Sequence, residues 1–244
     1  MAKQQSVIQF TGKVGELVGQ KSIKGDLVLR KRANGVRISN SMPSLKARAS
    51  FLAVSEAAKG LKNALFGLTH YAKQGRMSKR NAFMKLNYGK IAEITQSAGE
   101  TTANLHYTGV SIAKGDAIPV IFGRASVDVP EVISITYTPN AIVGITNDDD
   151  RVYLVAYNPA QNMTVQASAT RADTSIRIEG LPSSWSGQKV QLFGFVQQFT
   201  TQDAAIQYSA GIDNYGWVGY AQANEALANS IFSNSVYLGE VTVG

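Results

Sequence analysis

The chain has 244 residues, with 24 lysines and arginines, 17 aspartates and glutamates, two histidines and no cysteine, and a net charge of +7. Its 44% of hydrophobic residues excludes an intrinsically disordered chain. The absence of cysteine excludes a disulfide framework, a thiolate nucleophile, cysteine-ligated zinc and an iron–sulfur cluster. The first residues lack the apolar core of a signal peptide, and no apolar run approaches the roughly 20 residues that span a bilayer. We therefore expect a soluble protein made in the cytoplasm.

Charge divides the chain into two parts. Residues 1–90 contain 18 basic and three acidic residues, a net charge of +15, whereas residues 91–244 contain six basic and 14 acidic residues, a net charge of −8. This asymmetry is typical of a basic region that faces a polyanion or docks onto an acidic protein surface. A solvated helical face that serves solubility is the alternative. We predict two domains, a basic arm plus helical region over residues 1–90 and a β-sandwich over residues 91–244.

The beginning of the basic region is predicted to be extended. Residues 10–18 and 25–32 contain short apolar runs broken by glycine, which indicate an arm or hairpin that ends in the basic cluster Arg30-Lys31-Arg32. We expect the basic residues of this region to contact nucleic acid or neighbouring subunits through non-specific, salt-sensitive interactions. The residues expected to make these contacts are Lys21, Lys24, Arg30, Lys31, Arg32, Arg37, Lys46 and Arg48.

Two helices are predicted in the rest of the basic region. Residues 45–68 carry apolar side chains at three- and four-residue spacing, which predicts a helix with Ser44 as its N-cap. A second helix is predicted over residues 78–88, because Ser78 is a good N-cap and Gly89 a good terminator.

After residue 100 the apolar period changes to two, which predicts many short strands separated by turn residues. The predicted strands are residues 104–113, 117–122, 131–138, 141–146, 152–157, 164–170, 175–179, 188–197 and 235–243. Short strands at this spacing, without helices between them, favour an antiparallel β-sandwich, jelly-roll-like or immunoglobulin-like. The predicted fold class is α+β, mainly β.

One long segment interrupts this pattern. Residues 198–234 separate two predicted strands and contain three tyrosines and one tryptophan among glycines. Loops of this length are usually functional, and the composition is typical of an interface loop. A local helical insertion packed on its own domain is an equal alternative. The predicted interface residues are Tyr208, Tyr215, Trp217 and Tyr220.

No combination of residues predicts catalysis, a metal site or a cofactor. His70 and His106 do not have metal-ligand spacing, and each is interpreted as a surface or helix-end residue. The three aspartates Asp148-Asp149-Asp150 are interpreted as a hairpin turn between strands, because they lack the alternating spacing of a calcium loop. Arg171-Ala172-Asp173 is likewise interpreted as a turn. We expect neither an enzyme nor a cofactor.

Several motifs together resemble a known family. They are FTGKVGELVG at residues 10–19, NAFMKLN at residues 81–87, the strand at residues 152–159 and SNSVYLGEVTV at residues 233–243. The family that they resemble is uncharacterised, is found in Bacteroidota and their phages, and has a Gly-rich N-terminal motif and a C-terminal SNSVYLG-x-VTV motif. The resemblance implies a basic helical N-terminal region followed by a β-sandwich, and it implies no catalytic residue. The family's usual Asn-Pro-x-Thr segment is replaced here by Ser41-Met42-Pro43-Ser44.

Three functions are compatible with these features. The first is a structural, self-assembling virion protein of a bacteriophage, capsid or capsid-associated, assembled in the host cytoplasm from copies of itself and other virion proteins around packaged nucleic acid. The second is a non-specific nucleic-acid-binding protein. The third is an adhesion or carbohydrate-binding β-sandwich that uses the aromatic residues of the long segment. The first is the preferred hypothesis.

Overall fold

The computed structural model describes residues 2–3, 12–14, 17–21, 27–31, 40–89, 92–97, 100–129, 131–200 and 230–244. The chain forms two compact units, Met1–Ser41 and Met42–Gly244. Charge and composition predict a division at residue 90, whereas these units meet between Ser41 and Met42. The reason is that the helices after Ser41 share a hydrophobic core with strands of the second unit.

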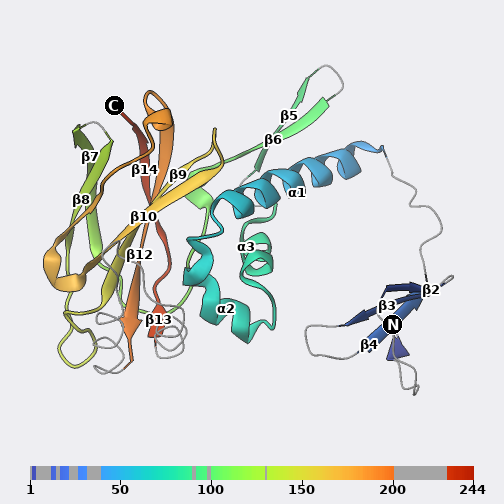
Figure 1. Ribbon diagram of the computed structural model, residues 1–244, viewed down its shortest axis with the longest axis horizontal. Helices are drawn as coiled ribbons and strands as arrows, with labels where there is room; N and C mark the ends of the chain where they lie inside the picture. The colour runs from blue at the N-terminus through green and yellow to red at the C-terminus, as the bar shows by residue number, and fades with distance from the viewer. Residues whose placement is uncertain are drawn as a thin grey trace. The chain divides into compact units, whose positions relative to one another are not determined.

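The first unit contains an antiparallel sheet in the order β1-β4-β3-β2 (Figure 1). Its strands are β1 (Ala2–Lys3), β2 (Gly12–Val14), β3 (Leu17–Lys21) and β4 (Leu27–Lys31). Two glycines, Gly12 and Gly19, lie opposite one another between β2 and β3. The predicted hairpin is therefore confirmed within the described residues. Arg30 and Lys31 lie on β4 with exposed side chains.

The second unit begins with a helical layer. Its elements are α1 (Met42–Gly60), the 3₁₀ helix η1 (Leu65–Leu68), α2 (Thr69–Gln74) and α3 (Lys79–Asn87). The first predicted helix is confirmed as far as Gly60. Its predicted N-cap is wrong, because α1 begins at Met42 and Ser44 lies inside its first turn. Pro43 suits that first turn, since it has a fixed φ and lacks an N–H group that would need a partner.

Both predicted ends of the second helix are confirmed. The backbone N–H of Asn81 donates to Ser78 Oγ at 3.2 Å, which caps α3. Tyr88 is the C-cap residue, and Gly89 after it has a φ of 72°. This left-handed conformation favours glycine and commonly ends a helix.

The β-strands of the second unit form three antiparallel sheets among the described residues. The largest has the order β10-β9-β12-β13, with β14 also paired to β12; the second has the order β11-β8-β7; the third is the hairpin β5-β6. Their bounds are β5 (Ala92–Ser97), β6 (Glu100–Leu105), β7 (Ile121–Val129), β8 (Val132–Thr138), β9 (Arg151–Asn158), β10 (Met163–Thr170), β11 (Ser175–Ile178), β12 (Lys189–Phe199), β13 (Ser230–Phe232) and β14 (Val236–Thr242).

The strands β9 and β12 lie at the centre and are buried on both faces. On one face, Tyr153 and Phe195 pack against the helices; on the other, Leu154 and Leu192 pack against β8 and β11. Figure 1 shows the helices on one side of the largest sheet and β7 and β8 on the other. Burial of both faces explains why these two strands read as nearly continuous apolar runs.

The predicted class, α+β and mainly β, is confirmed. The sandwich, jelly-roll-like or immunoglobulin-like, stays a prediction. The first, second and fifth strands from β7 onward (β7, β8, β11) form one sheet. The third, fourth, sixth and last strands (β9, β10, β12, β14) pair in the other.

Three predicted strands differ from the structure. In residues 104–113, β6 ends at Leu105 and the chain continues through the 3₁₀ helix η2 (Tyr107–Gly109) into irregular structure. There, a side chain takes the place of a neighbouring strand as hydrogen-bond partner of the backbone, since Asn87 Oδ1 accepts the Ser111 N–H at 2.9 Å. In residues 117–122 only the end is strand, since β7 begins at Ile121. Residues 141–146 form a turn.

Candidate functional site

Three chain segments meet at one end of the largest sheet. Thr170, the last residue of β10, pairs with Arg151, the first residue of β9, and Gln197 near the end of β12 pairs with the same Arg151. The β8–β9 connection (residues 139–150), the β10–β11 connection (residues 171–174) and the chain after β12 therefore leave the sheet together. We call this region the loop end.

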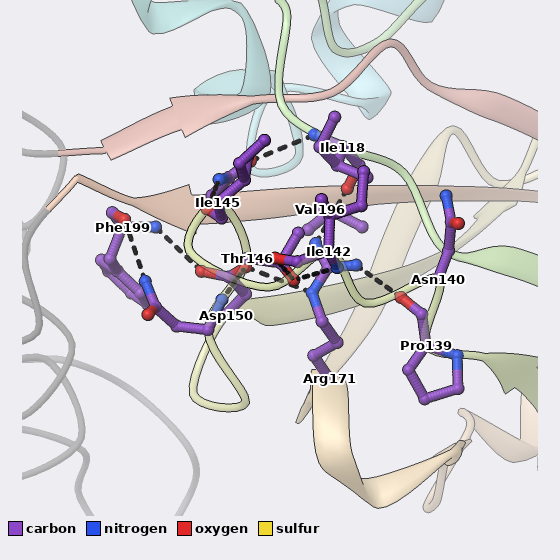
Figure 2. A network of polar contacts seen from close by, with 12 residues as sticks. Ile118, Pro139, Asn140, Ile142, Ile145, Thr146, Asp150, Arg171, Val196 and Phe199 are labelled. Atoms are coloured by element: carbon purple, nitrogen blue, oxygen red, sulfur yellow. Dashed lines mark hydrogen bonds and ion pairs between the residues drawn. The ribbon is translucent and has the colours of Figure 1, made fainter.

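A buried ion pair joins the segments of the loop end (Figure 2). The Arg171 Nε donates to Asp150 Oδ2 at 3.1 Å, and both side chains are 0% exposed. The two remaining guanidinium nitrogens donate to the carbonyls of Pro139 at 2.5 Å and Ile118 at 2.8 Å. Because a buried cation is costly unless it is paired and hydrogen-bonded, these contacts fix the position of Arg171.

Both carboxylate oxygens of Asp150 also accept backbone donors. Oδ1 accepts the Phe199 N–H and Oδ2 the Asn147 N–H, each at 3.1 Å. Burial raises the pKa of Asp150 above its ordinary value, and the two N–H groups and the Arg171 guanidinium act in the opposite direction. Asp150 thus connects the β8–β9 connection, Arg171 and the end of β12 in one network.

The sequence interpretation of this region is correct in part. Residues 148–150 do form a turn, but the hairpin is wrong, because residues 141–146, its predicted first strand, do not form a strand. Residues 171–173 form a 3₁₀ turn with a capping box between Thr170 and Asp173. The ion pair itself was not predicted. A signal was present in principle, since Asp150 lies two residues before one predicted strand and Arg171 directly follows another.

The β8–β9 connection presents an apolar turn. The N–H groups of Ile145 and Thr146 both donate to the Ile142 carbonyl at 3.0 Å, and Thr146 Oγ1 accepts the Ile142 N–H at 2.8 Å. Gly144 adopts a φ of 78°, a conformation that favours glycine. The turn is closed on itself, and its Ile142, Val143 and Ile145 side chains are exposed, Val143 fully.

A hollow of about 420 Å³ lies beside this turn. The described residues that line it are Gly144, Ile145, Asn147, Gln198, Phe199, Thr200 and Ile231. Gln198 anchors the turn from the sheet, because its amide donates to the Ile145 carbonyl and its Oε1 accepts the Ile118 N–H at 3.1 Å. The loop end therefore combines a concave site with a fixed apolar projection.

The helical layer carries the opposite charge to the rest of its unit. Nine cations lie in residues 42–89, all with exposed side chains, against the single acid Glu56. They are Lys46, Arg48, Lys59, Lys62, Lys73, Arg76, Lys79, Arg80 and Lys85. Glu56 forms an ion pair with Lys59 at 2.6 Å. The helical layer is thus a strongly positive surface.

The predicted contact residues are only partly described by the structure. Arg30 and Lys31 lie exposed on β4, Lys46 and Arg48 lie exposed on α1, and Lys21 is the last residue of β3. The remaining predicted residues lie outside the described residues; they are Lys24, Arg32, Arg37, Tyr208, Tyr215, Trp217 and Tyr220.

The histidines and acids do not form a recognisable metal centre in the part of the chain that the structure describes. No three or more of the potential ligands there are grouped so as to hold a metal ion. His70 lies in α2, and the exposed His106 has its Nε2 3.4 Å from Glu93 Oε2. No helix among the described residues is long and apolar enough to cross a bilayer.

Comparison with known proteins assigns the chain to a family. Residues 9–210 match the family of unknown function DUF6266, and the chain belongs to this family. No curated protein and no solved structure matches it. The predicted Gly-rich motif at residues 10–19 lies within the matched segment, whereas the motif at residues 233–243 lies beyond it. Occurrence in Bacteroidota and phages stays a prediction.

Proposed function

We propose that the protein is a self-assembling structural protein of a bacteriophage virion, capsid or capsid-associated. Its basic N-terminal region contacts packaged nucleic acid or neighbouring subunits. The observation that supports self-assembly best is the composition of the second unit. One unit combines nine exposed cations in its helical layer with an acidic, apolar loop end.

The exposed apolar side chains of the β8–β9 connection favour an associated protein over a monomer. Apolar side chains fixed in an ordered turn at the surface mark an interaction site more often than isolated ones do. Ile142, Val143 and Ile145 are held by hydrogen bonds within the turn and by Gln198. Protein partners bury such residues, whereas a solvated turn would favour polar ones.

Mass measurement in solution tests the proposal. The full chain is examined by light scattering over a wide range of protein concentrations and at low and high salt, and the samples are then imaged by electron microscopy. We expect discrete particles, rings or filaments of many copies. A monomer at every concentration and salt would contradict the proposal. Terminase or portal genes beside the coding sequence would support the virion origin.

Non-specific nucleic-acid binding outside a particle is the second candidate. The nine exposed cations of the helical layer favour it, because phosphate contacts come from lysine and arginine. If about six phosphates are contacted, the logarithm of the DNA association constant falls with the logarithm of salt at a slope of about −5. A flat salt response in a DNA titration would exclude this candidate.

A further inference from the structure

The helices α1 and α3 present a mixed apolar and basic surface. Phe51 and Leu52 on α1 are 57% and 61% exposed, although both are large apolar residues. One turn before Phe51, the Ala47 carbonyl accepts the hydroxyl of the exposed Tyr88 at 3.5 Å. One turn after Phe51, Ser55 Oγ accepts from Arg80 of α3 at 2.5 Å. The two helices therefore share one surface.

We call this the α1–α3 surface and define it by Arg48, Phe51, Leu52, Arg80 and Tyr88. Arg48 lies one turn before Leu52 on α1, and its side chain is exposed. Both charged residues in this set, Arg48 and Arg80, are cations. The aliphatic side chain of Leu52 contributes nothing to phosphate recognition, so the composition favours a protein partner with apolar and acidic groups.

The loop end has the complementary composition. We define the loop-end surface by Ile142, Val143, Ile145, Asp148 and Asp149. Among the described residues no ion pair involves Asp148 or Asp149, whereas Asp150 is buried against Arg171. The turn lies beside the 420 Å³ hollow, which is lined by both polar and apolar residues and adds a concave surface to the loop end.

We propose that the α1–α3 surface of one copy docks on the loop-end surface of a second copy of this chain. Positive charge then meets negative charge while the apolar side chains of both surfaces are removed from water. The two surfaces share no residue and come from different elements, so the contact joins unlike faces. A contact of this kind leaves one free surface of each type on every dimer, and it therefore builds rings or filaments.

The proposal rests on the proposed self-assembly, and paired variants of the full chain test it. The helix variant carries Arg48→Glu and Leu52→Ser; the loop variant carries Val143→Ser and Asp148→Asn. All four residues are at the surface, and circular dichroism checks that each variant is folded. Each variant alone should need a protein concentration at least about tenfold higher than the wild type for half-maximal assembly. A matched control, Lys114→Glu with Met163→Ser, changes one exposed cation and one exposed apolar residue elsewhere and should assemble like the wild type.

Mixing the two variants gives the decisive result. The loop variant keeps its α1–α3 surface and the helix variant keeps its loop-end surface, so an equimolar mixture should form a dimer of one copy of each and grow no further. A mixture with no such dimer would overturn the proposed contact. If both variants assemble like the wild type, this contact is wrong while the proposed function stands. A wild-type protein that stays monomeric would overturn both.

Nucleic acid is the competing occupant of the α1–α3 surface. A duplex DNA titration of the wild type and the helix variant distinguishes the two occupants. Loss of DNA binding in the helix variant, with unchanged assembly, would overturn the docking of a second copy. Retained DNA binding, with lost assembly, would support it.

Discussion

Breaking the buried ion pair should destabilise the second unit strongly. The substitution Arg171→Met removes the guanidinium that pairs with Asp150 and also leaves the carbonyls of Pro139 and Ile118 without their donors. It leaves a buried carboxylate with backbone donors only. Removing one partner of a fully buried pair costs about 3–5 kcal/mol, so we expect the free energy of unfolding to fall by that amount.

Urea unfolding measures this loss. Trp185 is fully buried and packs in the core between β8, β9 and β12, so its fluorescence reports the unfolding of the second unit. The matched control is Arg177→Met, because Arg177 forms an exposed pair with Glu179 at 3.7 Å. Exposed pairs contribute less than about 1 kcal/mol, and we expect the control to stay within that range.

A double variant separates the interaction from the two side chains. Arg171→Met together with Asp150→Ala removes both charges, so it should cost less than the sum of the single variants, with a coupling of about 0.5–3 kcal/mol. The reasoning would be refuted if Arg171→Met cost less than about 1 kcal/mol, or if the two single losses simply added.

Three further predictions concern other parts of the second unit. Burial raises the pKa of Tyr137 to about 12; because the folded pKa is above the unfolded value of about 10, its stabilising contribution is complete below pH 10 and is lost as the pH rises to about 12. Tyr137→Phe should therefore flatten the decline of stability between these values, measured as urea midpoints, and an unchanged decline would contradict the assignment. Gly194→Ala would place a Cβ 2.4 Å from the Phe122 ring and should cost about 1–3 kcal/mol in thermal unfolding. Adding Phe122→Leu should restore part of this loss, and no restoration would mean that the ring is not the obstacle. Ser78→Ala removes the cap of α3 and should cost about 1 kcal/mol by the same assay, whereas Ser78→Asp should cost much less.

Helices and strands could be predicted from the sequence where neighbouring residues in the chain determine them. Ser78 and Gly89 define α3 because capping and a left-handed residue act within a few positions of the chain. The apolar runs of β9 and β12 are equally readable, because strands buried on both faces carry apolar residues at most successive positions.

Strand predictions failed where apolar residues lie outside the sheets, either in the core or in an exposed turn. Val110 and Ile112 are buried, and the Ile112 N–H donates to Ser235 Oγ at 3.0 Å, a residue far along the chain. The apolar pattern of residues 141–146 likewise suggests a strand, but those side chains face solvent in a turn. An apolar pattern predicts burial or a strand, and neither holds when a turn is closed by its own hydrogen bonds.

Some features of the candidate site can be predicted from the sequence, and others depend on tertiary structure. The charge asymmetry and the basic residues Lys46 and Arg48 are properties of the sequence alone, because charge is a count and an amphipathic helix exposes its charged residues. The pairing of Asp150 with Arg171, 21 positions apart, depends on β9 and β10 lying side by side and on β12 ending next to them. The placement of an acidic, apolar turn on the same unit as the basic helices also depends on tertiary structure, because the helical layer and the sheets share one core. The mainly β class, the capped helix and the two opposite charges can thus be predicted from the amino-acid sequence. Which of these charges lie buried and which remain at the surface depends on how the strands and helices pack together.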